Sequence, residues 1–292
     1  MKRRGFLSAA LALALAPAGG LAAGRFERGL LWTVGVKNVA PSHVYGTIHM
    51  SDPRLAQLPA PVKKAFDGAR TLMLEFVPDV YAKRRFLEAA LFLDGQTLEQ
   101  KIGAEDFERA YRHLAPIGLD REFVNKMKPW GVLLNLYNPK GSAGAPLDTQ
   151  LLELARSRRM PLSQIEGVEE QVFTFDEFPM DSQVALLKHS LAHAPQLIAL
   201  GERTMEAYLA GDLARIWRLR KEFVARYPEI ARHQAVMDKR VVHDRNVVMA
   251  FRMQRELRRG NAFIAVGALH LYGAQGVLAR LEADGYRATR VP

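Results

Sequence analysis

NAFIAVGALHLYGAQG, residues 261–276, joins a short apolar run to a glycine and a histidine. The run from Ala262 to Val266 is uninterrupted, which is typical of a strand that a sheet buries on both faces. Gly267 follows the run, and His270 stands three residues later, between two leucines. We expect the glycine to permit a sharp turn that aims the imidazole across the carboxyl edge of the sheet.

The same pattern occurs near the other end of the chain, in HVYGTIHM, residues 43–50. There His49 stands three residues after Gly46, at the end of a run rich in β-branched and aromatic residues. The next predicted strand, RTLMLEFVPD at residues 70–79, carries Glu75. A single Gly-x-x-His match carries little information, but two matches at equivalent structural positions indicate a functional site.

These two units predict an α/β fold. Its core is a mixed sheet built from two strand–Gly-x-x-His–helix–strand repeats, one N-terminal and one C-terminal, with a large helical middle section. Residues 30–36 and 43–48 are expected to pair as a hairpin. Apolar positions at helical spacing predict helices at 105–114, 147–156, 181–193, 203–223 and 231–258. If both units enter one sheet, the two histidines meet where open α/β sheets bind ligands.

Residues 1–23 have a basic start, an apolar stretch and small residues near their end. This order is typical of an export signal peptide, which is too short to span a membrane stably. Arg3 and Arg4 suit a twin-arginine signal, and a general secretory signal fits them as well. Residues 24–292 are expected to form a single periplasmic or secreted domain without an integral membrane segment, and 138–146 a surface loop.

The composition excludes several classes of protein. There is no cysteine, which rules out disulfides, thiol nucleophiles and zinc–thiolate sites, so a metal ion has only His, Asp and Glu as ligands. The formal net charge is +10. Because the basic residues are scattered over helical segments without interleaved aromatic residues, nucleic-acid binding is not expected. The composition indicates no particular oligomeric state.

Five segments together resemble the TraB/GumN family, which includes Tiki-type metalloproteases and pheromone-shutdown proteins. They are LWTVGVKNVAPSHVYGTIHMSDPRLAQLP, TLMLEFV, MPLSQIEGVEEQ, HDRN and FIAVGALHLYGAQGVLARLEADGYRATRV. The resemblance implies a metal-dependent peptidase that relies on both Gly-x-x-His motifs and on acidic residues. It places His49, His270 and Glu75 at the metal, with Glu166 as a second acid. The segment HDRN supplies Arg245 and Asn246.

The chemistry of these residues suits a metal site. Two neutral imidazoles and one or two carboxylates can hold a divalent ion such as Mn²⁺, Co²⁺ or Zn²⁺. The ion polarises a substrate carbonyl and lowers the pKa of a bound water, while a carboxylate that does not bind it, Glu75 or Glu166, acts as general base. Arg245 is expected to bind a substrate carboxylate, stabilise an oxyanion or pair with a glutamate. Asn246 is expected to help orient the substrate groups.

Other polar residues have simpler explanations. Asp148 is expected to cap its helix. His189 and His193 lie four residues apart on one helix face, but nothing in the sequence supplies a third ligand. His233 and His243 are expected to be solvated on a long basic helix.

Two functions remain open. The first is an exported metal-dependent hydrolase, most simply a peptidase that uses a metal-activated water on a peptide or protein substrate. The second is a binding protein on the same scaffold, which captures a peptide, haem or another small ligand without turnover. Replacing Glu75 by Gln distinguishes them, because only turnover depends on the carboxylate.

Overall fold

The computed structural model describes residues 24–136 and 145–292. Six strands form one sheet in the order β4-β3-β5-β2-β1-β6, which confirms the predicted α/β class. The strands are β1 Leu31–Gly35, β2 Ser42–Thr47, β3 Thr71–Leu74, β4 Leu162–Gln164, β5 Ala262–Gly267 and β6 Arg287–Arg290. The N-terminal unit supplies β1 to β3 and the C-terminal unit β5 and β6, so both predicted units enter one sheet.

The strand β5 lies between β2 and β3 and runs parallel to both. Its first five residues are buried, as an uninterrupted apolar run predicts for a strand covered on both faces. β1 pairs antiparallel with β2, which confirms the predicted hairpin, and antiparallel with β6 on its other side. β4 runs parallel to β3. The carboxyl ends of β2, β3, β4 and β5 therefore lie along one edge of the sheet.

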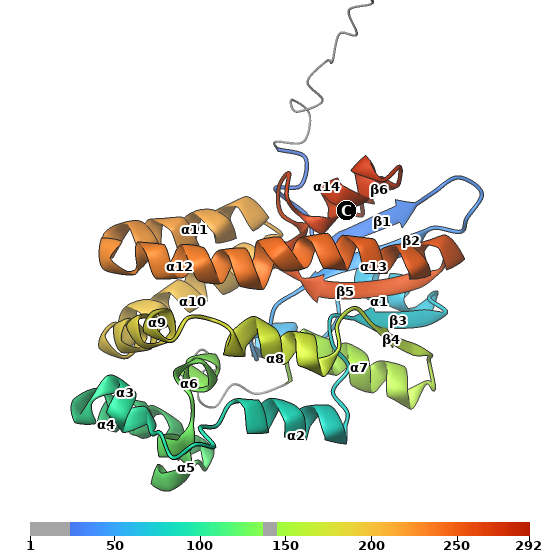
Figure 1. Ribbon diagram of the computed structural model, residues 1–292. Helices are drawn as coiled ribbons and strands as arrows, with labels where there is room; N and C mark the ends of the chain where they lie inside the picture. The colour runs from blue at the N-terminus through green and yellow to red at the C-terminus, as the bar shows by residue number, and fades with distance from the viewer. Residues whose placement is uncertain (1–23, 137–144) are drawn as a thin grey trace, which may run out of the picture.

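Helices cover both faces of the sheet (Figure 1). α1 (Ala60–Asp67) connects β2 to β3, and α14 (Val277–Ala283) connects β5 to β6 in the opposite direction across the sheet. Because such crossovers are right-handed, the two helices lie on opposite faces. α7 (Leu147–Ser157) contacts β3, and α13 (Arg245–Arg259) contacts both β5 and α14.

The other helices form the middle section, beside the carboxyl edge of the sheet (Figure 1). They are α2 Val80–Ala89, α3 Leu98–Ile102, α4 Ala104–Leu114, α5 Arg121–Lys126, α6 Pro129–Leu136, α8 Val168–Asp176, α9 Met180–Ala192, α10 Ala194–Leu209, α11 Leu213–Arg226 and α12 Ala231–Asp238. Short 3₁₀ turns lie within this section, at η2 Ala115–Ile117 and η3 Pro228–Ile230, and after two strands, at η1 Pro53–Leu55 following β2 and η5 Ala268–Leu271 following β5. The helices predicted at 105–114, 147–156 and 181–193 are confirmed.

Two predicted helices differ from the structure. The helix expected at 203–223 is divided into α10 and α11, because Gly211 has a φ of +62° and Asp212 accepts a hydrogen bond from the Arg215 N–H to begin α11. The helix expected at 231–258 is interrupted by a π-helical segment, η4 (Lys239–Asp244), between α12 and α13. π-Helical turns are rare and occur often at functional sites.

The two motif glycines do not make the sharp turns expected of them. Gly46 lies inside β2, and Gly267 has a φ of −54°, so neither uses the left-handed region that favours glycine. Gly46 matters for space instead: a Cβ there would lie 2.8 Å from Leu271 Cδ1 and 3.0 Å from Ala268 Cα. β2 and η5 therefore pack closely, which brings His270 beside β2.

The predicted export signal and most of the predicted loop at 138–146 lie outside the described residues. Within the described ranges, no helix is both long enough and apolar enough to cross a membrane.

Candidate active site

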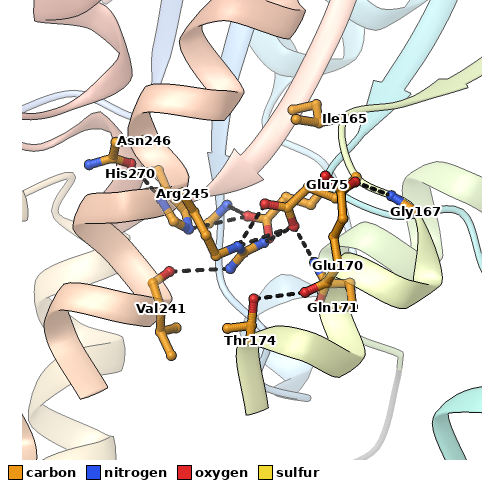
Figure 2. A network of polar contacts seen from close by, with 12 residues as sticks. Glu75, Ile165, Gly167, Glu170, Gln171, Thr174, Val241, Arg245, Asn246 and His270 are labelled. Carbon is orange, nitrogen blue, oxygen red and sulfur yellow. Dashed lines mark hydrogen bonds and ion pairs between the residues drawn. The ribbon is translucent and has the colours of Figure 1, made fainter. Parts of the chain in front are cut away.

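Polar side chains gather where the parallel strands end (Figure 2). His49 follows β2, Glu75 follows β3, Glu166 follows β4, and His270 lies on η5 directly after β5. Because β2 and β5 are adjacent and parallel, the two Gly-x-x-His motifs meet at this edge. Arg245, from the start of α13, donates hydrogen bonds to both Glu75 and Glu166, and Figure 2 shows it beside Glu75 and His270.

Glu75 is buried and fully engaged, with 8% of its surface exposed. Its Oε1 accepts a hydrogen bond from the Gly267 N–H at 2.6 Å, and its Oε2 accepts one from Arg245 Nη2 at 2.6 Å. Burial raises the pKa of this carboxyl, but His270, Arg245 and His49 together outweigh burial and lower the pKa to about 2. Glu75 is therefore ionised at neutral pH.

Arg245 is the cation that holds both glutamates. Its Nε and Nη2 donate to the Glu166 carboxylate at 2.8–3.1 Å, and its Nη1 donates to the Val241 carbonyl at 3.3 Å. Burial lowers the pKa of the guanidinium, but Glu75 and Glu166 raise it by a larger amount, so the group stays charged. Val241 lies in the π-helical segment η4, so this segment contacts the site through the hydrogen bond to Arg245.

His270 is fixed by Asn246. Its Nδ1 lies 2.6 Å from Asn246 Oδ1, while the Asn246 amide donates to the Gln275 carbonyl at 2.9 Å. This network assigns the proton of the imidazole to Nδ1 and leaves Nε2 with an unshared electron pair, 3.7 Å from Glu75 Oε1. Burial lowers the pKa of His270 to about 4 against the opposing charge of Glu75, so the ring is neutral.

His49 is fixed by Asp148, which the sequence did not identify as a site residue. The His49 Nδ1 lies 2.8 Å from Asp148 Oδ2, and Asp148 Oδ1 accepts a hydrogen bond from Thr47 Oγ1 at 2.8 Å. Partial burial lowers the pKa of His49, but Asp148 and Glu75 raise it to about 9. The expectation that Asp148 caps its helix was wrong, because Pro146 occupies the N-cap position of α7.

Two imidazoles and a carboxylate surround one point above Gly267. A Cβ on Gly267 would lie 3.4 Å from Glu75 Oε1, 3.5 Å from His270 Cδ2 and 3.6 Å from His49 Nε2. The missing side chain leaves this space open. Each imidazole has Nδ1 against an oxygen, which is the arrangement of metal-binding histidines, and the raised pKa of His49 means that this ring must release its second proton before its Nε2 can bind an ion.

The donor set fits a divalent ion in its chemistry, since it offers two imidazole nitrogens and an ionised carboxylate. In the ranges 24–136 and 145–292, no group of three or more His, Asp or Glu side chains stands close enough together to hold a metal ion, so at least one of these side chains must move to bind one. The side chain of His49 is 63% exposed and follows the end of β2. It is therefore the donor with the most room to approach an ion.

A cavity of about 660 Å³ opens from this cluster. Five of the residues predicted for the site line it: His49, Glu75, Arg245, Gly267 and His270. Glu166 and Asn246 lie behind them and are 3% and 1% exposed. Glu166 therefore positions Arg245, and Asn246 positions His270.

The remaining histidines lie elsewhere. His233 was expected to be solvated, but it is 5% exposed with its Nδ1 2.8 Å from Ser182 Oγ, because α12 packs against α9. His243 is half-buried, with its ring 5.8 Å from that of Trp217. His189 and His193 stack with ring centroids 4.2 Å apart, a geometry that does not direct both lone pairs at one ion.

The fold and this cluster define an α/β protein with a histidine–glutamate–arginine site at the carboxyl edge of its sheet. The chain belongs to the TraB/PrgY/gumN family, whose sequence model matches residues 30–290 and confirms the resemblance. It is 26% identical over 238 residues to the uncharacterized protein YbaP of Shigella flexneri, covering 80% of this chain and 84% of that protein.

Two further relatives match the chain. YbaP of Escherichia coli K12 is 26% identical over 237 residues, covering 79% of this chain and 84% of that protein. The metalloprotease TIKI2 of Xenopus tropicalis is 24% identical over 314 aligned positions, covering 90% of this chain and 60% of that protein. No solved structure is significantly similar to the chain.

Proposed function

We propose that the protein is a metal-dependent hydrolase that acts on peptides. The observation that carries the proposal is the pair of imidazoles, each anchored through Nδ1, that stand beside the ionised Glu75 at an open space. Family membership and the distant similarity to a metalloprotease support a hydrolase in general terms. Export to the periplasm or the medium is part of the proposal and rests on residues 1–23.

His49, His270 and Glu75 are the residues that would hold a divalent ion such as Mn²⁺, Co²⁺ or Zn²⁺. A bound ion supplies a Lewis acid for the scissile carbonyl and lowers the pKa of water. Glu75 lines the cavity and Glu166 does not, so Glu75 is the carboxylate at the reacting centre. It serves either as a third ligand or as the group that accepts a proton from the attacking water.

Arg245 has one N–H group left for a substrate. Of the five N–H groups of a guanidinium, Nε, both of Nη2 and one of Nη1 have partners among the described residues. Because Arg245 lines the cavity, the remaining Nη1 hydrogen is placed to stabilise negative charge on a substrate oxygen. Glu166 holds the guanidinium in this position.

Metal content tests the proposal. The full-length protein is dialysed against Mn²⁺, Co²⁺ or Zn²⁺, and bound ions are counted by mass spectrometry beside the His49→Ala/His270→Ala variant. We expect about one ion per wild-type chain and none in the variant, since two of three ligands are removed. The matched control is His43→Ala/His113→Ala, which removes two imidazoles that do not line the cavity. Equal uptake by all three proteins would exclude this metal site.

The Glu75→Gln variant separates the two roles of Glu75 and the two functions. Lost uptake would make Glu75 a ligand. Retained uptake with lost peptide cleavage would make it the proton acceptor. If both proteins bind metal fully and bind peptide, but neither cleaves it, the result would favour a binding protein over a hydrolase.

Asp148→Asn is expected to weaken metal affinity about 10- to 100-fold, the usual effect of losing a carboxylate that orients a ligand histidine. The amide keeps the shape of the side chain but removes the charge that holds the His49 ring. Titration calorimetry with Co²⁺ measures the change, with Asp67→Asn, an exposed ion-pair residue, as control. Unchanged Co²⁺ affinity would show that His49 needs no orienting group.

A further inference from the structure

The cavity beside Glu75 is apolar over most of its wall. Its apolar part, which we call the chamber, is lined by side chains of the middle section, among them Phe86, Trp130, Leu133, Phe175, Phe178 and Met237. Three of these are aromatic rings in mutual contact: the centroid of Trp130 lies 5.3 Å from that of Phe86 and 5.5 Å from that of Phe175. The reacting cluster and the chamber therefore share one continuous space.

The chamber lies where three separately packed groups of apolar side chains meet. Leu74 and Tyr208 belong to the core of the sheet, Leu133 and Phe178 to the core of the helical section, and Trp130 to a smaller aromatic group. None of these groups fills the space, although protein interiors leave few voids larger than a water molecule. The whole cavity, which comprises the chamber and the space at the reacting cluster, has a volume of about 660 Å³, as ligand-binding sites do.

The charged side chains in the wall away from Glu75 already have partners. Arg220 forms an ion pair with Asp238. Arg240 donates to the carbonyl oxygens of Phe173 and Thr174, in the last turn of α8. A charged ligand group gains little from either arginine, so the binding free energy in the chamber comes from burying apolar surface.

We propose that the chamber binds a bulky apolar side chain of the substrate, preferentially an aromatic one, next to the bond that is cleaved. The cleavage rests on the proposed function, whereas the binding itself needs no metal. The three rings in the wall favour an aromatic partner, because stacked and edge-to-face rings attract beyond their buried area. A small side chain would leave the chamber unfilled, and a charged one would lose its hydration without gaining a partner.

Peptide binding to the metal-free, full-length protein tests the inference. The probes are Ac-Ala-Ala-Phe-Ala-Ala-NH2, the same peptide with Lys at the centre, and Ac-Ala-Ala-Ala-Ala-Ala-NH2, measured by titration calorimetry. We expect the Phe peptide to bind about 10- to 100-fold more tightly than the other two, from burial of one aromatic side chain. Equal affinities for the three peptides would overturn the inference.

Variants on one helix locate the binding. Thr174→Trp places a ring in the chamber that Thr174 lines and is expected to abolish the preference for Phe. Phe175→Ala removes part of the aromatic wall and is expected to weaken the preference for the Phe peptide. The matched control is Phe173→Ala, since Phe173 is 61% exposed and lies outside the cavity. Because Thr174→Trp removes no core side chain, it decides the outcome even if Phe175→Ala unfolds.

The two proposals fail separately. A Thr174→Trp protein that keeps the Phe preference would overturn the chamber inference, whatever its metal content. A wild-type protein that prefers the Phe peptide but takes up no metal would leave the chamber as a binding site and overturn only the hydrolase.

Discussion

Replacing Arg245 with methionine is expected to lower the free energy of unfolding by about 3–5 kcal/mol. The guanidinium lies between two buried carboxylates, with Nη2 2.6 Å from Glu75 Oε2 and 2.8 Å from Glu166 Oε2. Methionine fills similar space but leaves two buried negative charges facing each other without a cation. Urea denaturation followed by circular dichroism measures the change.

Restoring the charge balance supports this explanation. Arg245→Met combined with Glu75→Gln and Glu166→Gln is expected to recover a large part of the lost stability, because no buried charge is then left unpaired. The control is Arg252→Met, which breaks a surface pair with Glu170 and is expected to cost about 1 kcal/mol or less. Equal losses for Arg245→Met and Arg252→Met would show that the buried cation is not structurally required.

Changing Gly267 to alanine is expected to abolish metal uptake and, with it, hydrolysis, while stability changes by about 0.5 kcal/mol or less. The backbone of Gly267, with φ −54° and ψ 136°, is open to alanine. The new methyl group meets its neighbours at 3.4–3.6 Å, an ordinary contact distance. It occupies, however, the point that His49, His270 and Glu75 surround. Ion counting and urea denaturation of the same sample give both quantities.

Gly46→Ala is the contrasting variant, because it is expected to lower stability, which Gly267→Ala leaves nearly unchanged. Its Cβ would lie 3.0 Å from the Ala268 backbone, so β2 and η5 must separate, at a cost of about 1–3 kcal/mol. A Gly267→Ala protein that binds an ion like the wild type would show that the metal does not use this point. The two motif glycines would then have only a packing role.

Local patterns predicted most of the fold. The apolar run before Gly267 forms the central strand β5, and the β-branched runs at 30–36 and 43–48 form the hairpin of β1 and β2. These predictions succeeded because the spacing of apolar residues along a strand indicates which of its faces are buried. The same reasoning missed the break at Gly211 and the π-helical segment. Both depend on backbone conformations that helical periodicity does not encode.

By itself, the sequence determined the α/β class, the family, and the placement of both Gly-x-x-His motifs and of Glu75 at strand ends. Apolar runs and the residue types that flank them are local properties of the chain, so the sequence carries them directly. Only the tertiary structure decided which partner each group meets: Asp148 against His49, Asn246 against His270, and Glu166 behind Arg245. These partners come from different elements and are far apart in the chain, and their burial and charge arise only when the helical section closes over the edge of the sheet.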